Sequence, residues 1–534
     1  MLAGMTQRLL IRLALLTAFT AAGAPASTPA PVPARDPNAF AIEIVDDQTG
    51  RGVPLVELET VNNLRLYTDS AGVAAFREPW MMNQTVFFYV RSHGYEFEKD
   101  WIGFAGRQVE VKPGGSVKWS IKRINVAERL YRVTGGGIYA DSLLLGRPAP
   151  IEHPLINSGV LGLDSVQAAV YRGKIYWFWG DTNRLSYPLG SFGTTGATSD
   201  LPGQGGLDPS IGVNLRYFAN DEGFVRPMLT RPEKGPLWTD AVCVVPDAQG
   251  RERLVGNFIR VKTLGENLER GIVVWDDDKQ AFEKQVDIPL DHPLGPQGQA
   301  VTRRVVHDGV AYQYFAHWGP ANIRVPATLE RFLDLSAYEG YTPLAPGARF
   351  DGPNTRLERD ASGKLVWGWK RDTPPLENRQ KQKLAELGLM KPEESPQVPV
   401  DVETGKPVVL HSASIQWNEY RKRWVMIALE FDGTSKLGEV WYGEADAPEG
   451  PWSKVRKVVT HHKYSFYNPR HHAFFDGDGG RYLYFEGTFA NSISGTDVAT
   501  PKYDYNQVMY RLDLDDPRLA AVRSATTAPE SPAR

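Results

Sequence analysis

Short apolar segments recur along the chain between Asp164 and Thr488, each preceded by a tight turn and each ending in a polar or charged residue. They are rich in Val, Ile, Tyr, Phe and Trp and are too short for helices of ordinary length, so they are predicted to be strands. A second apolar segment lies before each turn, which predicts β-hairpins. The second strands of the predicted hairpins span residues 175–182, 253–260, 310–318, 364–372, 423–431 and 481–489.

From the second repeat onward, the hairpins recur with a nearly constant period of roughly 55 to 60 residues, close to that of kelch-type repeats. Small antiparallel sheets repeated in this way are typical of a β-propeller, whose blades surround a central axis. We therefore predict an all-β protein whose residues 124–522 form a five- or six-bladed propeller. The number of blades depends on whether the repeat over 354–372, which a charged, helical insert over 375–394 interrupts, forms a full blade. From the second repeat onward, the first strands start at Asp240, Gln299, Asn354, Ser412 and Arg470.

Residues 39–123 show a different pattern, in which short alternating runs are broken by turn residues. This segment resembles the transthyretin-like sandwich of carboxypeptidase regulatory domains. The resemblance rests on the Gly52-x-Pro54 step and on the turn Thr68-Asp69-x-x-Gly72. It implies a separate N-terminal β-sandwich, to which we assign no chemistry.

The N-terminal sequence predicts the cellular compartment of the protein. Arg8 and Arg12 precede an apolar run over 13–22 and the small residues 24–26, which together are typical of a signal peptide over residues 1–26. Residues 27–38, rich in Pro and Ala, are predicted to be a disordered spacer, as are residues 523–534 at the other end. We expect a secreted or periplasmic bacterial protein.

Composition narrows the possible partners. The 51 glycines and 39 prolines suit a turn-rich chain, and the single cysteine, Cys243, excludes an internal disulfide. A formal net charge of −3 gives no reason to expect nucleic acid as a partner. No segment after the signal peptide is long and apolar enough to predict a membrane span.

In a propeller, the starts of the first strands and the ends of the second strands meet around one mouth, so the polar residues at these positions predict a shared site. Asp240 is expected to hold a sugar or tune a neighbouring pKa, and Glu430 and Glu486 are candidate distant acids. The candidate catalytic residues are Asp164, Asp181 and Glu486. The candidate substrate-binding residues are Asp240, Arg260, His317, Glu430, Tyr467, Arg470, His471, His472 and Trp179.

Strand register singles out one pair of aspartates. A two-residue turn at Arg172-Gly173 pairs Tyr171 with Lys174, and extending this ladder places Asp164 opposite Asp181. Two carboxylates this close raise a pKa or recruit a cation, as at many functional sites. The alternative is that each aspartate only caps its own turn. The same reasoning places Arg470 opposite Glu486 and predicts an ion pair there.

The segment from Gly162-Leu163-Asp164 through Gly180-Asp181-Thr182 resembles the opening blade of propeller glycosidases. The similarity is to the family that includes bacterial endo-D-arabinanases and, more distantly, to the arabinanase and fructosidase clan. It implies a glycoside hydrolase in which Asp164 and Asp181 are catalytic, with a polysaccharide or oligosaccharide as substrate and without a cofactor.

Two other functions remain open. The stretch from His461 to His472 carries four of the ten histidines, and with Tyr467 and Arg470 it could act as a polysaccharide lyase by removing a proton next to a uronate. The same histidines, with His317 or Glu486, could instead bind a divalent cation. The third possibility is a glycan-binding propeller that does not catalyse a reaction.

Overall fold

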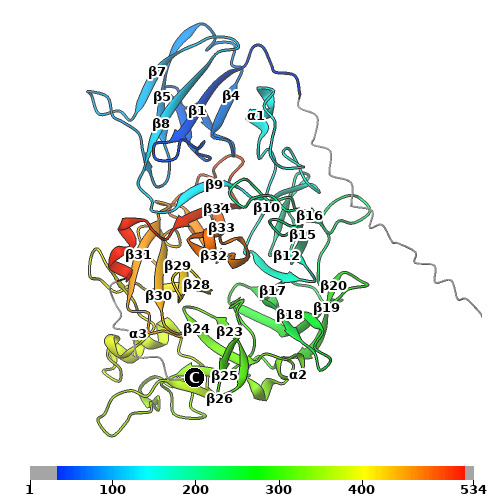
Figure 1. Cartoon of the computed structure of the whole chain (residues 1–534), viewed down its shortest axis with the longest axis vertical. Coiled ribbons are helices and arrows are strands. Elements are labelled where there is room, and N and C mark those ends of the chain that lie inside the picture. The colour runs from blue at the N-terminus through cyan, green and yellow to red at the C-terminus, as the bar shows by residue number, and fades with distance from the viewer. Residues whose placement is uncertain (1–32, 524–534) are drawn as a thin grey trace, which may run out of the picture.

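The computed structural model describes residues 33–523 (Figure 1). The predicted signal peptide, residues 27–32 of the predicted spacer and residues 524–534 of the predicted tail lie outside this range. The fold is all-β, as predicted. Two four-stranded sheets, with strand orders β4-β1-β8-β6 and β3-β2-β5-β7, form the N-terminal part. Their strands are β1 (Phe40–Asp46), β2 (Glu57–Thr60), β3 (Arg65–Tyr67), β4 (Val73–Phe76), β5 (Gln84–Arg91), β6 (Tyr95–Glu96), β7 (Gly106–Val111) and β8 (Ser116–Arg123).

One hydrophobic cluster lies between these two N-terminal sheets. Strand β8 alternates between exposed and buried positions, so Trp119 and Ile121 point inward, where they meet Ile42 of their own sheet and Phe88 of the other. Such alternation is expected for a sheet with one face on a core and the other in water. The N-terminal part therefore has a core of its own.

Five further sheets, each of four or more strands, follow along the chain, with a three-stranded sheet, β10-β13-β14, beside the first of them. The five are β11-β12-β15-β16, β17-β18-β19-β20, β21-β23-β24-β25-β26 with β22 on β23, β27-β31-β30-β29-β28, and β32-β33-β34-β9. The strands up to β20 are β9 (Glu128–Arg132), β10 (Val160–Leu163), β11 (Gln167–Tyr171), β12 (Lys174–Trp179), β13 (Thr182–Arg184), β14 (Tyr187–Ser191), β15 (Thr195–Asp200), β16 (Arg216–Tyr217), β17 (Leu237–Pro246), β18 (Glu252–Thr263), β19 (Glu266–Asp276) and β20 (Ala281–Asp287).

The remaining strands are β21 (Gln299–Ala300), β22 (Val305–His307), β23 (Val310–Ala316), β24 (Ala321–Pro326), β25 (Glu339–Thr342), β26 (Gly368–Arg371), β27 (Val400–Asp401), β28 (Leu410–Asn418), β29 (Arg423–Glu430), β30 (Val440–Ala445), β31 (Lys454–Val459), β32 (Ser465–His471), β33 (Tyr482–Ala490) and β34 (Asn506–Asp513). The α-helices are short: α1 (Ala140–Leu144), α2 (Leu329–Phe332), α3 (Asn378–Glu386) and α4 (Ala520–Arg523).

Each of the five sheets contains one predicted hairpin, and the strands that open these hairpins contact one another in turn. Strand β11 lies against β17, β17 against β21, β21 against β28, and β28 against β32. The series returns to its start because the guanidinium of Arg470, in β32, donates to Gln167 Oε1 (3.3 Å) and to the carbonyl of Ala168 (3.0 Å), both in β11. The five sheets therefore form a circuit in which the last sheet lies beside the first (Figure 1).

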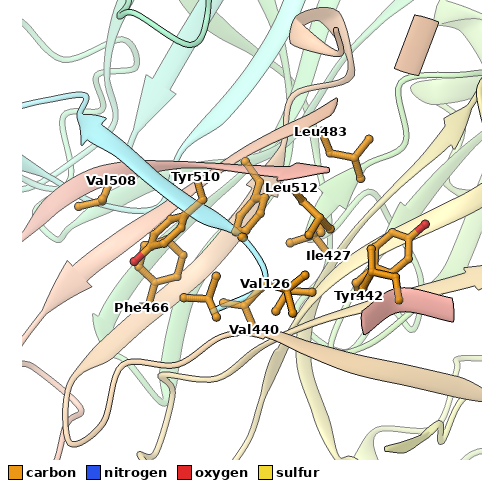
Figure 2. Close-up of a cluster of buried hydrophobic side chains, with 14 of the residues drawn as sticks. Val126, Ile427, Val440, Tyr442, Phe466, Leu483, Val508, Tyr510 and Leu512 are labelled. Carbon is orange, nitrogen blue, oxygen red and sulfur yellow. The ribbon is translucent and has the colours of Figure 1, made fainter. Parts of the chain in front are cut away.

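The last sheet is completed by a strand from the beginning of this part of the chain. Strand β9 pairs antiparallel with β34, and Tyr131 lies opposite Met509. Figure 2 shows the adjoining core, where Val126, just before β9, lies among side chains such as Val440 and Tyr510. Burial of these apolar groups joins the two distant segments of sequence.

Five of the six predicted hairpins form paired strands, whereas the one over 354–372 is reduced to a single antiparallel bridge between Arg359 and Leu365. Strand β26 is instead the outermost strand of the third sheet, paired with β25. Leu365 of this segment packs with Leu344 and with Leu384 of α3 in a small separate cluster. The repeat is therefore part of an insertion in the third sheet and does not form a sheet of its own.

The N-terminal sheets pack against the last sheet of the circuit. The Tyr503 hydroxyl donates to the carbonyl of Thr68 (2.7 Å), and the Thr49 hydroxyl donates to Glu128 Oε1 (2.7 Å). His93 packs against the aromatic rings of Tyr464 and Phe489. Between residues 33 and 523, none of the helices has the length and apolar character needed to cross a membrane.

Candidate functional site

Asp164 and Asp181 meet where the first sheet begins, and their predicted proximity is confirmed. The ladder of β11 and β12 has the predicted register, from Tyr171 opposite Lys174 to Gln167 opposite Phe178. Beyond its end, the backbone N–H of Asp181 donates to the Asp164 carboxylate (2.9 Å). Both side chains are partly buried and remain accessible to solvent.

A break in the strand directs the Asp164 carboxylate toward this position. Ser165 has a left-handed backbone (φ 56°), and its N–H donates to Thr488 Oγ1 in the last sheet (2.9 Å). Non-glycine residues with such backbones carry strain and cluster at functional sites. Gly180 lies against the carboxylate, since a Cβ at this position would be 2.3 Å from Asp164 Oδ1. A side chain at position 180 would therefore displace the carboxylate.

For a reaction that depends on this carboxylate, we expect Gly180→Ala to reduce kcat/KM by about 100-fold, because misplacing a reacting group by about 1 Å has effects of this order. Gly265→Ala is the matched control, since a Cβ there meets no atom within 4 Å. Initial rates and circular dichroism of both variants provide the measurement. If the Gly180 variant retained full activity, the Asp164 carboxylate would not need its present position.

Two tyrosines and one tryptophan hold the aspartates. The Tyr467 hydroxyl donates to Asp164 Oδ2 (3.1 Å), and the Tyr505 hydroxyl also hydrogen-bonds to Asp164. The indole N–H of Trp238, in the second sheet, donates to Asp181 Oδ1 (2.8 Å). Side chains from the second and last sheets thus hold the carboxylate pair of the first sheet in place.

Burial controls the protonation of the pair. It raises the pKa of Asp164 to about 7, with a second contribution from the negative charge of Asp181. Burial also raises the pKa of Asp181, while the hydrogen bond from Trp238 lowers it. Because the two charges repel, the pair retains a proton at pH values at which an isolated aspartate is fully ionised.

The same local geometry recurs in the second and last sheets. Ala241 and Asn468 have left-handed backbones (φ 53° and 52°), and each follows a polar residue near the start of a first strand. A register shift accompanies each of them, between Asp240 and Cys243 and after Tyr467. Such β-bulges re-aim side chains. Asp240 and Tyr467 are therefore the counterparts of Asp164 in their own sheets.

Asp240 is fully engaged by protein groups. It accepts hydrogen bonds from Asn257 Nδ2 (2.6 Å) and from the backbone N–H of Gly298 at the start of the third sheet (2.7 Å). Burial nevertheless raises its pKa to about 6. Asp240 thus links two sheets next to the site.

The predicted cluster of basic residues does not line the mouth. Arg470 and His471 are each 1% exposed, and His472 and Glu486 are fully buried. The pairing of Arg470 with Glu486 is confirmed, but the two side chains do not form a salt bridge, although the charge of Arg470 lowers the pKa of Glu486. Arg470 donates to Gln167 and Ala168 instead, and Glu486 hydrogen-bonds to His472 Nε2 (2.8 Å). Burial raises the pKa of Glu486 to about 8.

Three further candidates serve the packing of the sheets. Trp179 is 1% exposed and stacks on Trp177 (ring centroids 6.2 Å apart), so it offers no face to a sugar. Arg260 donates to Glu269 Oε2 (3.0 Å), and Glu430 accepts from the Trp441 indole (2.9 Å). Trp179 therefore lies in the core, and Arg260 and Glu430 each bond to the neighbouring strand of their own sheet.

No three His, Cys, Asp or Glu side chains within residues 33–523 are grouped so that they could hold a metal ion. His317, the remaining candidate, is partly buried at the end of β23. Sequence reasoning missed Tyr505, which lies in the loop before β34 and has a left-handed backbone (φ 60°). No local pattern marks this residue, because its role depends on the last sheet lying beside the first.

No model of a protein family matches the chain, and neither does any curated protein. Among solved structures, the chain is similar to a putative exo-β-1,3-galactanase from Bifidobacterium bifidum s17, with 11% identity and a TM-score of 0.37 over 73% of this chain and 94% of the other. It is also similar to an α-L-arabinanase from Penicillium chrysogenum complexed with arabinobiose, with 12% identity and a TM-score of 0.33 over 73% and 99% of the two chains.

A third similar structure is a GH43_1 enzyme from Xanthomonas citri, with 12% identity and a TM-score of 0.32 over 66% of this chain and 87% of the other. Glycoside hydrolases are thus among the solved structures that the chain is similar to. At TM-scores this low the likeness is remote, and function is therefore inferred from the site.

Proposed function

We propose that the protein is a secreted glycoside hydrolase that cleaves a polysaccharide or oligosaccharide at the Asp164 and Asp181 pair. The observation that carries this proposal is the direct contact of the two residues, in which the Asp181 N–H donates to the Asp164 carboxylate (2.9 Å). Glycosidases require two carboxyl groups beside the scissile bond, one of which is protonated. Because its pKa is raised to about 7, Asp164 is the acid, and Asp181 is the ionised partner.

The architecture is consistent with this role. We propose that the five sheets are the blades of a five-bladed β-propeller and that the N-terminal sheets are a transthyretin-like sandwich. The mouth of the propeller would present the aspartates to a chain-like substrate. The resemblance of the Asp164 and Asp181 segments to the endo-D-arabinanase family supports the same reaction class.

The lyase alternative is not supported by the site. A lyase needs its base and its charge-neutralising arginine in contact with substrate, whereas Arg470 and His472 are buried and bonded to protein groups. Only Tyr467 of that cluster reaches the aspartates.

A polysaccharide panel tests the proposed function. Purified protein is incubated with arabinan, galactan, xylan, arabinogalactan and polygalacturonan, and both reducing ends and unsaturated products are measured. New reducing ends without unsaturation are expected for at least one polymer. Unsaturated products would identify a lyase, and binding without any cleavage would identify a glycan-binding protein; either result contradicts the proposal.

Activity should decline above pH 7. The general acid must be protonated, and Asp164 loses its proton as the pH rises through its pKa of about 7. The hydrogen bond from Tyr467 favours ionised Asp164 and so lowers its pKa. Tyr467→Phe should therefore move the alkaline limb of the kcat/KM profile to higher pH. A wild-type profile that stays flat up to pH 9, or a shift to lower pH in the variant, would contradict this assignment.

A further inference from the structure

The third sheet has its own counterpart of the Asp164 position, which is Gln297. Gly298, next to the start of strand β21, has a left-handed backbone (φ 75°). Ser165 and Ala241 have left-handed backbones at the corresponding places in the first and second sheets. Counting back three residues from Ala300, which pairs with Phe315, gives Gln297. Asp240 occupies the same position in the second sheet. The Gln297 side chain is partly buried, and within the described residues its amide forms no hydrogen bond.

His317 and Trp318 lie beside this glutamine. A Cβ on Gly298 would be 2.1 Å from the Ala316 carbonyl oxygen and 3.1 Å from His317 Cα, so the two segments are in close contact. Trp318 is 43% exposed despite its size, and its backbone is left-handed (φ 50°). A bulky residue is rarely held in this conformation without a structural or functional reason.

An aromatic row connects Trp318 to the carboxylate pair. The Trp318 ring lies edge-on to His411 (centroids 4.6 Å apart), and His411 stacks on Phe431 at an interplanar angle of 8°. Phe431 packs against the hydrophobic cluster that contains Tyr467, the residue that donates to Asp164. A series of packed side chains therefore links Trp318 to the tyrosine that holds Asp164.

The groups beside Trp318 are uncharged at neutral pH. Burial lowers the pKa of His317 to about 4, helped by the nearby charge of Arg270, and burial lowers the pKa of His411 to about 4. The buried Nδ1 atom of His411 has no hydrogen-bond partner among the described residues. Nη2 of Arg270 donates to the carbonyls of Pro289 and His292, while its buried Nε has no hydrogen-bond partner among the described residues.

We infer that Gln297, His317, Trp318 and His411 form a binding subsite for a neutral sugar unit of the glycan, across the mouth from Asp164 and Asp181. An indole face stacks on the C–H face of a sugar ring, while an amide and neutral imidazoles donate to and accept from its hydroxyls. The absence of a free cation among these four residues disfavours a uronate. This inference rests on the proposed function, because it places a second sugar of the same substrate.

Steady-state kinetics on the panel polysaccharide that the wild type cleaves fastest tests the subsite. Trp318→Ala and Gln297→Ala should each raise KM about tenfold, equivalent to about 1.4 kcal/mol of binding, with kcat within about threefold because the acid and its partner are untouched. Trp318→Phe retains a stacking ring and should stay close to the wild type. Trp101→Ala and Gln108→Ala, at exposed positions of the N-terminal sheets, are matched controls.

The outcomes separate the two proposals. If the wild type cleaves a polymer and the Trp318 and Gln297 variants keep its KM, the subsite is wrong and the proposed function stands. If the wild type neither cleaves any panel polymer nor binds one in affinity electrophoresis, both are wrong. Tight binding of polygalacturonan that Trp318→Ala abolishes would overturn the assignment to a neutral sugar.

Discussion

Asp164→Asn and Asp181→Asn should each lower kcat/KM by about 10³-fold, within the range that positioned acids and bases contribute. Asparagine keeps the size of the side chain and can still accept the hydrogen bonds of Tyr467 and Trp238. It cannot donate an acidic proton or carry the negative charge. The loss should therefore appear mainly in kcat, with binding of the glycan preserved.

The matched control for this pair is Asp278→Asn, because Asp278 is an exposed aspartate in the turn between β19 and β20. Reducing-end assays and thermal melts of the three variants separate chemistry from folding. If either site variant kept more than a tenth of wild-type activity while folded, the carboxylate pair would not be the catalytic centre.

Trp177→Ala should destabilise the fold by about 3 to 5 kcal/mol, the usual cost of truncating a buried aromatic residue to alanine. Trp177 is fully buried, its indole N–H donates to Ser199 Oγ (2.9 Å), and its ring lies edge-on to His472 (5.0 Å) in the last sheet. The side chain thus joins the first and last sheets beneath the aspartates.

Urea denaturation followed by circular dichroism measures this effect, with Trp101→Ala as the control because that residue is 92% exposed. A midpoint for Trp177→Ala equal to that of the control would show that the seam between the two sheets does not limit stability.

Local patterns predicted much of the fold and one part of the site. The Arg172-Gly173 turn fixed the register of its hairpin, so the proximity of Asp164 and Asp181 followed from the sequence. Apolar segments also predicted five of the six hairpins. The sixth forms only one antiparallel bridge, because Leu365 packs in a separate cluster with Leu344 and α3, and hydrophobicity alone does not show which core a residue joins.

The remaining site residues depend on contacts between sheets. His472 and Glu486 were expected at the mouth, yet they lie in the interior, because a bulge after Tyr467 changes which residues face the mouth. Tyr505 and Gln297 lie outside the predicted strands, and their roles depend on neighbours distant in sequence. A single sequence contains no direct signal for such contacts.

The pairing of β9 with β34 also sets when this site is assembled during synthesis. Glu128 of β9 contacts Arg511, which lies 383 residues later in the chain. Asp164 likewise depends on Tyr467 and Tyr505 from the last sheet. A ribosome-bound chain that lacks these residues leaves β9 with an open edge and the aspartates without their tyrosines. The nascent chain is therefore expected to be inactive until its C-terminal sheet has been made, so the proposed glycan cleavage would begin only after translation is complete.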